Sequence, residues 1–208
     1  MSKTVTYYLS LNSPWSFLGG TPLGAIAKRT GATVDVRPLD VMRLFKESGS
    51  QPLSQRPKAR QDYRLWEIQR WSRRLGIPIR SHPGAFPCDE RLAAACVLAL
   101  KANGGDALGL ATALGRALWV DNRDLAQRAV VAEVLGAAGH DADALLAEAE
   151  GRADHWEAQR QANTDAALGA GAFGVPLKVS RCTCSWSRMW RNTAALAVRL
   201  PSTAIWPS

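Results

Sequence analysis

The chain has 208 residues, of which 47% are hydrophobic and 21% are charged, and its net charge is +8 at neutral pH. This length suits one sizeable domain, or one domain with an insertion, and is too short for two typical independent domains. No apolar run approaches the ~20 residues that span a bilayer, and the first residues lack the apolar block of a signal peptide. We therefore expect a cytoplasmic protein that does not bind membranes.

Two predicted strands flank a helix at the start of the chain. Residues 4–11 alternate apolar and polar side chains and are rich in β-branched and aromatic types, and residues 32–38 repeat this pattern. Gly31 marks the end of the helix between them. A strand, a helix and a strand of these lengths favour a right-handed parallel βαβ unit.

The start of this helix carries two serines. Ser13 followed by Pro14 is typical of an N-cap and a first helical residue, whereas Ser16 falls inside the first turn. Thr21 and Pro22 repeat the Ser-Pro signature, so we expect the helix in two pieces with a kink near Pro22. A cap alone would explain Ser13, but a helix N-terminus can also hold an anion or a thiolate.

The middle of the chain is predicted to be almost entirely helical, from about residue 40 to 165. No repeat and no low-complexity linker separates this block from the strands, so we interpret it as an insertion in an α/β domain. A short strand follows it, beginning at the Val175-Pro176 peptide. The predicted helices of the block cover residues 57–75, 89–102, 106–118, 124–137, 141–150 and 152–168.

Cysteines and charges narrow the function classes. The four cysteines form no Cys-x-x-Cys pair and no zinc-binding spacing with the three histidines, so we expect unreactive thiols and no structural metal. Basic residues concentrate between Arg56 and Arg80, and again beyond Asp165, where the sequence has no acidic residue. No nucleic-acid-binding motif accompanies them, so a small anion is favoured over nucleic acid as the partner.

Several short motifs occur in a particular order and spacing: Ser-Pro-Trp-Ser-Phe-Leu-Gly at 13–19, Arg-Pro-Leu-Asp-Val at 37–41, Asp-Tyr at 62–63, Gln-Arg-Trp at 69–71, Gly-Ile-Pro at 76–78 and Phe-Gly-Val-Pro at 173–176. Together they resemble the 2-hydroxychromene-2-carboxylate isomerases, relatives of the kappa-class glutathione transferases. The resemblance covers roughly residues 4–176 and implies a DsbA-like thioredoxin fold with a large helical insertion. Residues 1–40 and about 165–208 would form the thioredoxin-like domain, and residues 41–164 the insertion.

The turn after the first strand of a thioredoxin fold normally holds a reactive Cys-x-x-Cys at a helix N-terminus. Here that place reads Ser13-Pro-Trp-Ser16, and a serine hydroxyl cannot exchange disulfides, although it can donate a hydrogen bond to another molecule's thiolate. The resemblance implies that the thiolate belongs to glutathione and that Ser13 is the catalytic serine. Glutathione would act as a cofactor, converting 2-hydroxychromene-2-carboxylate to trans-o-hydroxybenzylidenepyruvate in naphthalene-type catabolism.

The resemblance also implies the binding residues. A cis Pro176 would let the backbone of Val175 and Pro176 pair with the cysteinyl part of glutathione. Carboxylates of glutathione and substrate need cations, for which the basic segment is the expected source. For Trp15 and Phe17, packing in the core is the alternative. The candidates for glutathione, besides Ser13, are Ser54, Gln55, Lys58, Val175 and Pro176, and those for the aromatic acid substrate are Trp15, Phe17 and Arg60.

The chain departs from the family pattern at its C-terminal end. From Leu177 on it has no acidic residue and carries Cys182 and Cys184 within three positions, which we interpret as a reading-frame change in the source gene. We expect poor packing after about residue 180. Two other functions stay open: a kappa-like glutathione transferase acting on other electrophiles, and a small-acid-binding protein with impaired catalysis. A homodimer is compatible with each of them.

Overall fold

The computed structural model describes residues 3–181 of the chain. In this part three strands form one sheet in the order β2-β1-β3, comprising β1 (Thr4–Leu9), β2 (Thr33–Pro38) and β3 (Leu177–Arg181). β1 runs parallel to β2 and antiparallel to β3, so the parallel pairing predicted for the first two strands is confirmed. β1 ends two residues earlier than predicted, because Ser10 and Leu11 already belong to the turn that leads into the first helix.

The helix α1 (Pro14–Thr30) joins the two parallel strands. Ser13 caps its start and Gly31 ends it with a φ of 65°, a left-handed conformation that favours glycine. The prediction of two separate pieces is wrong, because α1 runs through Pro22 without interruption. Close packing on a neighbouring helix holds it in place: a side chain on Gly20 would meet Thr112 Oγ1 at 3.0 Å.

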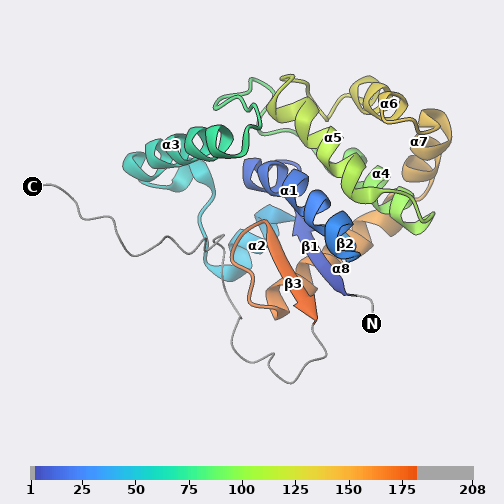
Figure 1. The fold of residues 1–208 in the computed structure, drawn as a ribbon, viewed down its shortest axis with the longest axis horizontal. Helices are drawn as coiled ribbons and strands as arrows, with labels where there is room; N and C mark the ends of the chain where they lie inside the picture. The colour runs from blue at the N-terminus through green and yellow to red at the C-terminus, as the bar shows by residue number, and fades with distance from the viewer. Residues whose placement is uncertain (1–2, 182–208) are drawn as a thin grey trace, which may run out of the picture.

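The helical block contains seven α-helices and one 3-10 turn, η1 (Leu53–Gln55), among the described residues. Two predicted starts are corrected: Asp89 and Asp124 precede their helices, because each carboxylate accepts a bond from an N–H two residues later. Figure 1 shows α3 at one side of the molecule and α4 to α7 gathered at the other. The helices are α2 (Val41–Ser48), α3 (Lys58–Leu75), α4 (Arg91–Ala102), α5 (Ala107–Trp119), α6 (Arg128–Ala137), α7 (Ala142–Gly151) and α8 (Ala153–Gly169).

The sheet buries both of its faces. Alternate residues of β1 point to opposite sides, so Tyr7 and Leu9 join the large core built with α1 and α4 to α7, whereas Tyr8 packs with α2 and α8. The helical block therefore shares a continuous core with the sheet instead of forming one of its own. The boundaries proposed at residues 40 and 165 follow the order of elements and stay a prediction.

The start of the atypical C-terminal stretch is ordinary in structure, since Leu177–Arg181 is the strand that pairs with β1. The predicted loss of packing after about residue 180, with its two cysteines, falls on residues 182–208 and lies outside the described part. Within residues 3–181, every helix is too short or too polar to span a lipid bilayer.

Candidate active site

Ser13 lies in the turn between β1 and α1, directly before the first residue of the helix. Its extended backbone caps the helix, and its Oγ accepts a hydrogen bond from the Ser16 N–H at 3.2 Å. The same hydroxyl donates to the backbone carbonyl of Val175 at 3.3 Å. The Val175-Pro176 peptide is cis, as the sequence analysis predicted. The Ser13 hydroxyl thus joins two segments that are 162 positions apart in the sequence. Ser13 is 8% exposed.

Two backbone donors of the segments that meet here have no partner within the described residues. Pro14 has no N–H, so Trp15 supplies the first amide of α1, and that amide makes no hydrogen bond there; nor does the amide of Val175. The first turn of α1 holds no acidic side chain. The helix start therefore combines a partial positive charge, one hydroxyl and the available N–H of Trp15, which suits an anionic atom.

Ser16 has a structural role in this turn. It is 6% exposed, and its Oγ accepts a bond from the Ser10 N–H at 3.4 Å. The buried hydroxyl of Tyr7 donates to the Ser16 carbonyl at 2.6 Å, and burial raises the pKa of Tyr7 above its ordinary value. These bonds fix the first turn of α1 on β1.

Distant segments hold the turn from its other side. The side-chain amide of Asn12 pairs in both directions with the backbone of Cys88, at 2.9 and 3.1 Å. The Nε1 of fully buried Trp119 donates to the Leu11 carbonyl at 2.9 Å. Trp119 therefore packs in the core, and the turn is anchored to the loop before α4 and to the end of α5.

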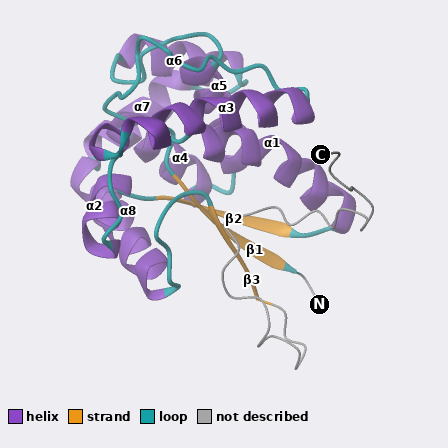
Figure 2. Ribbon diagram, turned by 90° about the vertical axis from the view of Figure 1, so that its left-hand side faces the viewer, coloured by secondary structure: helices purple, strands orange, loops and turns teal. Residues whose placement is uncertain are grey.

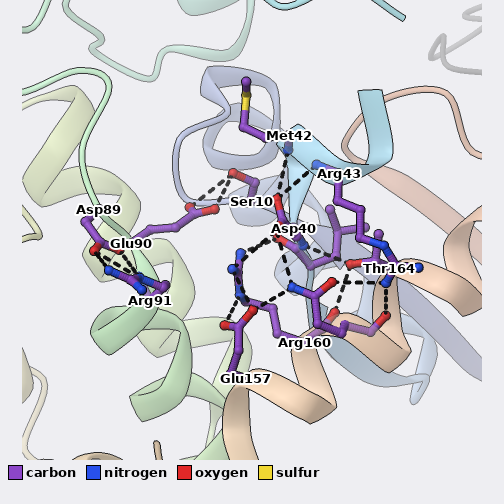
Figure 3. Close-up of polar contacts among 12 residues, drawn as sticks. Ser10, Asp40, Met42, Arg43, Asp89, Glu90, Arg91, Glu157, Arg160 and Thr164 are labelled. Carbon is purple, nitrogen blue, oxygen red and sulfur yellow. Dashed lines mark hydrogen bonds and ion pairs between the residues drawn. The ribbon is translucent and has the colours of Figure 1, made fainter. Parts of the chain in front are cut away.

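A buried carboxylate completes this anchoring. Glu90 is 6% exposed and accepts bonds from the Ser10 hydroxyl at 2.8 and 3.0 Å and from the Asn12 N–H at 2.9 Å. Burial raises its pKa, although these hydrogen bonds act in the opposite direction. Figure 3 shows Glu90 reaching from the start of α4 to Ser10.

Beyond Glu90 lies a group of mutually paired charges at the end of β2, which Figure 3 also shows. Arg160 donates to both oxygens of Glu157 at 2.8 and 3.0 Å and lies 3.5 Å from the Asp40 carboxylate. Asp40 also caps α2 and donates its N–H to Thr164. Burial alone would raise the pKa of Asp40, but the hydrogen bonds and the charge of Arg160 outweigh it, so the pKa is lowered.

The remaining predicted residues divide by exposure. Phe17 is 5% exposed, lies in the core, and its Cδ2 would be 3.1 Å from a side chain on Gly115 of α5, which fits the packing alternative. Trp15 is half-buried. Ser54 and Gln55 lie in η1 and are exposed, as are Lys58, which pairs with Asp62, and Arg60. Their assignments to glutathione and substrate stay predictions.

The segment before η1 nevertheless contacts the loop that carries Val175, the residue bonded to Ser13. The Ser50 hydroxyl donates to the Phe173 carbonyl at 2.8 Å, two residues before Val175. The loop that carries Ser54 and Gln55 is thereby tied to the loop that carries the cis-proline. By contrast, a surface hollow of about 560 Å³ on α3 contains no predicted site residue; it is lined by Tyr63, Trp66, Glu67, Gln69, Arg70 and Arg73.

One cation near the turn was not among the predicted site residues. Arg64 of α3 places its guanidinium carbon 5.7 Å from the ring centre of Phe86 and 6.0 Å from that of Trp119. Burial, together with the charge of Arg56, lowers the pKa of Arg64 to about 10. The only sequence signal was its place in the basic segment, because the two rings that hold it come from residues far along the chain.

The described cysteines are not poised for thiol chemistry. Cys88 and Cys96 are free, and burial raises the pKa of Cys88 to about 11 and that of Cys96 to about 12. Both thiols are therefore protonated at neutral pH. No cluster of three potential metal ligands occurs within residues 3–181.

Comparisons with known proteins agree with this architecture. The sequence model of one protein family, the DSBA-like thioredoxin domain, matches residues 4–187. A 2-hydroxychromene-2-carboxylate isomerase from Sphingobium xenophagum is 32% identical over 184 residues, covering 85% of this chain and 88% of that protein. The match to the family model spans residues 10–16, which we call the serine turn, together with the helical block and the cis-proline.

Two solved structures share the fold. A 2-hydroxychromene-2-carboxylate isomerase superposes with a TM-score of 0.67 at 23% identity, covering 85% of this chain and 84% of the other. The cytosolic disulfide reductase DsbM from Pseudomonas aeruginosa, solved with GSH, gives 0.65 at 20% identity and covers 84% of each chain. The predicted DsbA-like thioredoxin fold is thus confirmed, and the chain belongs to the 2-hydroxychromene-2-carboxylate isomerase family.

Proposed function

We propose that the protein is a glutathione-dependent isomerase that converts 2-hydroxychromene-2-carboxylate to trans-o-hydroxybenzylidenepyruvate. The observation that carries this proposal is the Ser13 hydroxyl at the start of α1, 3.3 Å from the carbonyl oxygen next to the cis-proline. The curated relative at 32% identity bears the name of this isomerase. The turn holds no thiol, so disulfide exchange, the activity named for one fold neighbour, cannot take place on its side chains.

The donor set at the turn fits glutathione. The Val175 carbonyl and N–H can pair with the cysteinyl backbone of the tripeptide, as an added strand would. The Ser13 hydroxyl, which rotates freely about its C–O bond, can turn from the Val175 carbonyl to a sulfur atom, and the Trp15 N–H points from the same helix start. When bound, glutathione supplies a nucleophilic thiolate that adds to the conjugated substrate and later leaves, so that none is consumed.

The residues of this chain then stabilise the thiolate and keep the hydrogen-bond donors in position. Ser13 donates its proton to the sulfur in a hydrogen bond and stabilises the thiolate over the thiol, and the positive end of α1 acts in the same direction. Tyr7 and Glu90 keep the turn on β1 and α4, so that the hydroxyl and the amides do not have to be oriented during the reaction. The fold neighbour DsbM was solved with GSH, which is a property of that protein.

The first test is Ser13→Ala, assayed with glutathione present and absent. We expect kcat/KM to fall roughly 10- to 100-fold, as for loss of a hydrogen bond to a charged group, while Ser13→Thr, which keeps the hydroxyl, retains more of the rate. Wild type without glutathione should show no isomerisation. The measurement is the absorbance change of the aromatic acid together with the concentration of free thiol.

The control is Asp141→Ala, which removes the cap of α7 far from the turn, where the carboxylate accepts from the Ala144 N–H at 3.0 Å. Both variants should lose about 0.5–2 kcal/mol of stability, but only Ser13→Ala should lose activity. Equal rates for wild type and Ser13→Ala would remove Ser13 from the mechanism. Loss of one thiol per turnover would instead identify a glutathione transferase.

A further inference from the structure

Arg64 is a cation without a counter-ion in the described part of the chain. It makes no hydrogen bond and no ion pair with residues 3–181, whereas Lys58 and Arg70 of the same helix pair with Asp62 and Glu67. Removing an arginine from water without a partner is unfavourable, and here burial lowers its pKa to about 10. A group held in this way is prepared for an anion that arrives from outside.

The guanidinium of Arg64 is held by aromatic rings. Its central carbon lies 5.7 Å from the centre of Phe86 and 6.0 Å from that of Trp119, and these two rings lie 5.0 Å apart. Every fully buried polar side-chain atom in the described part has a hydrogen-bond partner, so the unpaired nitrogens of Arg64 must reach the surface. The rings therefore orient the cation while its N–H groups stay accessible.

Both rings are attached to the serine turn. Trp119 donates its Nε1 proton to the Leu11 carbonyl at 2.9 Å, and the loop of Phe86 is tied to Asn12 through the backbone of Cys88. Arg64 thus belongs to the surroundings of Ser13, although fifty residues of chain separate them. Both views place α1 between α3, which carries Arg64, and β3, which begins two residues after Val175 (Figures 1 and 2).

We propose that Arg64, with the partly exposed ring of Phe86 beside it, binds the carboxylate of the aromatic acid substrate; this rests on the function proposed above. A planar guanidinium offers two parallel N–H donors to a carboxylate, and the partly exposed ring of Phe86 offers a flat apolar surface to an aromatic ligand. The fully buried Trp119 supports the guanidinium from the core side and does not face the ligand. The backbone of Val175, which accepts from the Ser13 hydroxyl, is the part suited to a peptide. The cation that holds the substrate is therefore Arg64 and not the exposed Arg60, one turn earlier.

Binding can be measured without turnover, with trans-cinnamate as the probe and its methyl ester as the uncharged counterpart. We expect wild type to bind cinnamate more tightly than the ester, and Arg64→Leu to weaken cinnamate roughly 10- to 100-fold while leaving the ester and glutathione unchanged. Arg64→Lys keeps the charge but not the paired donors, so its affinity for cinnamate should lie between those of wild type and Arg64→Leu. Isothermal titration gives all three affinities.

The matched control is Arg74→Leu, because Arg74 is an exposed arginine of the same helix that also lies over a ring, 6.0 Å from the centre of Trp71. It should leave the affinity for cinnamate unchanged. In the isomerase assay Arg64→Leu should raise KM more than it lowers kcat. Thermal unfolding of each variant verifies that it is folded, and Arg64→Lys carries the test if the leucine variant is not.

The inference is overturned if wild type binds cinnamate no better than the ester, or if Arg64→Leu and Arg74→Leu behave alike. It is also overturned if Arg64→Leu weakens glutathione and leaves cinnamate unchanged, since Arg64 would then serve the tripeptide. Failure of the proposed function looks different. Wild type would then show no isomerisation, while the preference of Arg64 for the carboxylate over the ester would persist.

Discussion

Two polar clusters lie close to the ends of β1 and β2, and they differ in whether their groups have partners. In the first, which we call the closed cluster, Asp40, Glu157 and Arg160 satisfy one another. In the second, the open cluster, the amides of Trp15 and Val175 and the guanidinium of Arg64 have no partner in the described part of the chain. Each cluster is partly buried, so burial alone does not distinguish them.

This difference separates a structural role from a binding role. Buried polar groups in proteins are nearly always paired, and where several unpaired donors converge, the missing acceptor is expected from a ligand. The closed cluster joins α2 and α8 at the end of β2, and nothing in it is free to bind an anion. The open cluster offers only donors, which matches an anionic sulfur and a carboxylate.

The largest effect should come from opening the closed cluster. Arg160→Leu leaves Asp40 and Glu157 without their cation, and we expect the free energy of unfolding to fall by about 3 kcal/mol, the low end for a broken buried pair because both carboxylates are partly exposed. Urea unfolding measures it. The activity per folded molecule should be unchanged in Arg160→Leu. Arg64→Leu should show the opposite pattern, with unchanged stability and weakened substrate binding.

Arg128→Leu provides the control for Arg160→Leu. Arg128 pairs with Glu150 at 2.7 Å, but both side chains are about half exposed. An exposed pair contributes at most about 1 kcal/mol, so this variant should unfold close to wild type. Equal losses for the two arginines would mean that the closed cluster contributes no more than a surface ion pair.

A smaller and pH-dependent effect is expected at Glu90, between the two clusters. Burial raises its pKa above the ordinary value of 4.5, so the folded protein keeps a proton that the unfolded chain has released. Stability from this group is therefore present at low pH and is lost as the pH rises through the folded-state value. Glu90→Gln cannot lose this proton, so the stability of wild type relative to the variant should decrease with rising pH.

Unfolding free energies of both proteins at about pH 5 and about pH 8 test this sign. An advantage of wild type that grows toward pH 8 would contradict it. Loss of the Asn12 contact in the variant lowers stability at every pH and does not imitate the slope.

The smallest effect is expected at the solvent-exposed rim of the closed cluster. Asp165 pairs with Arg43, but its side chain is 60% exposed and Arg43 also pairs with Glu47. Asp165→Ala should therefore change the unfolding free energy by less than about 1 kcal/mol. A loss as large as that of Arg160→Leu would show that the cluster is cooperative up to its surface.

The sequence was informative where local rules decide the structure. Alternation marked β1 and β2, the Ser13-Pro14 pair marked the start of α1, and glycine at 31 marked its end. The starts of two later helices were placed too early, because Asp89 and Asp124 can cap a turn as well as a helix. Local signals thus give elements and their approximate limits.

The partners of the serine turn were beyond such rules. Glu90 and Trp119 contact residues 10 to 12 from 78 to 108 positions away, and no periodicity or motif in either segment indicates it. The cis Val175-Pro176 peptide was predicted only through the family resemblance. Arg64 stood in the segment singled out as basic, but nothing in the sequence distinguished it from the other arginines there, because the rings that hold it are brought together only by the fold.

The wiring of the serine turn also bears on how the protein is made. The turn lies within the first sixteen residues, yet its contacts come from residues 88, 90, 119 and 175. Synthesis proceeds from the N-terminus, so the turn leaves the ribosome long before its partners. It therefore lacks these contacts during most of translation. Contacts of such separation form late, once the loops between them have closed. Catalytic competence is therefore expected to be among the last properties a newly made chain acquires.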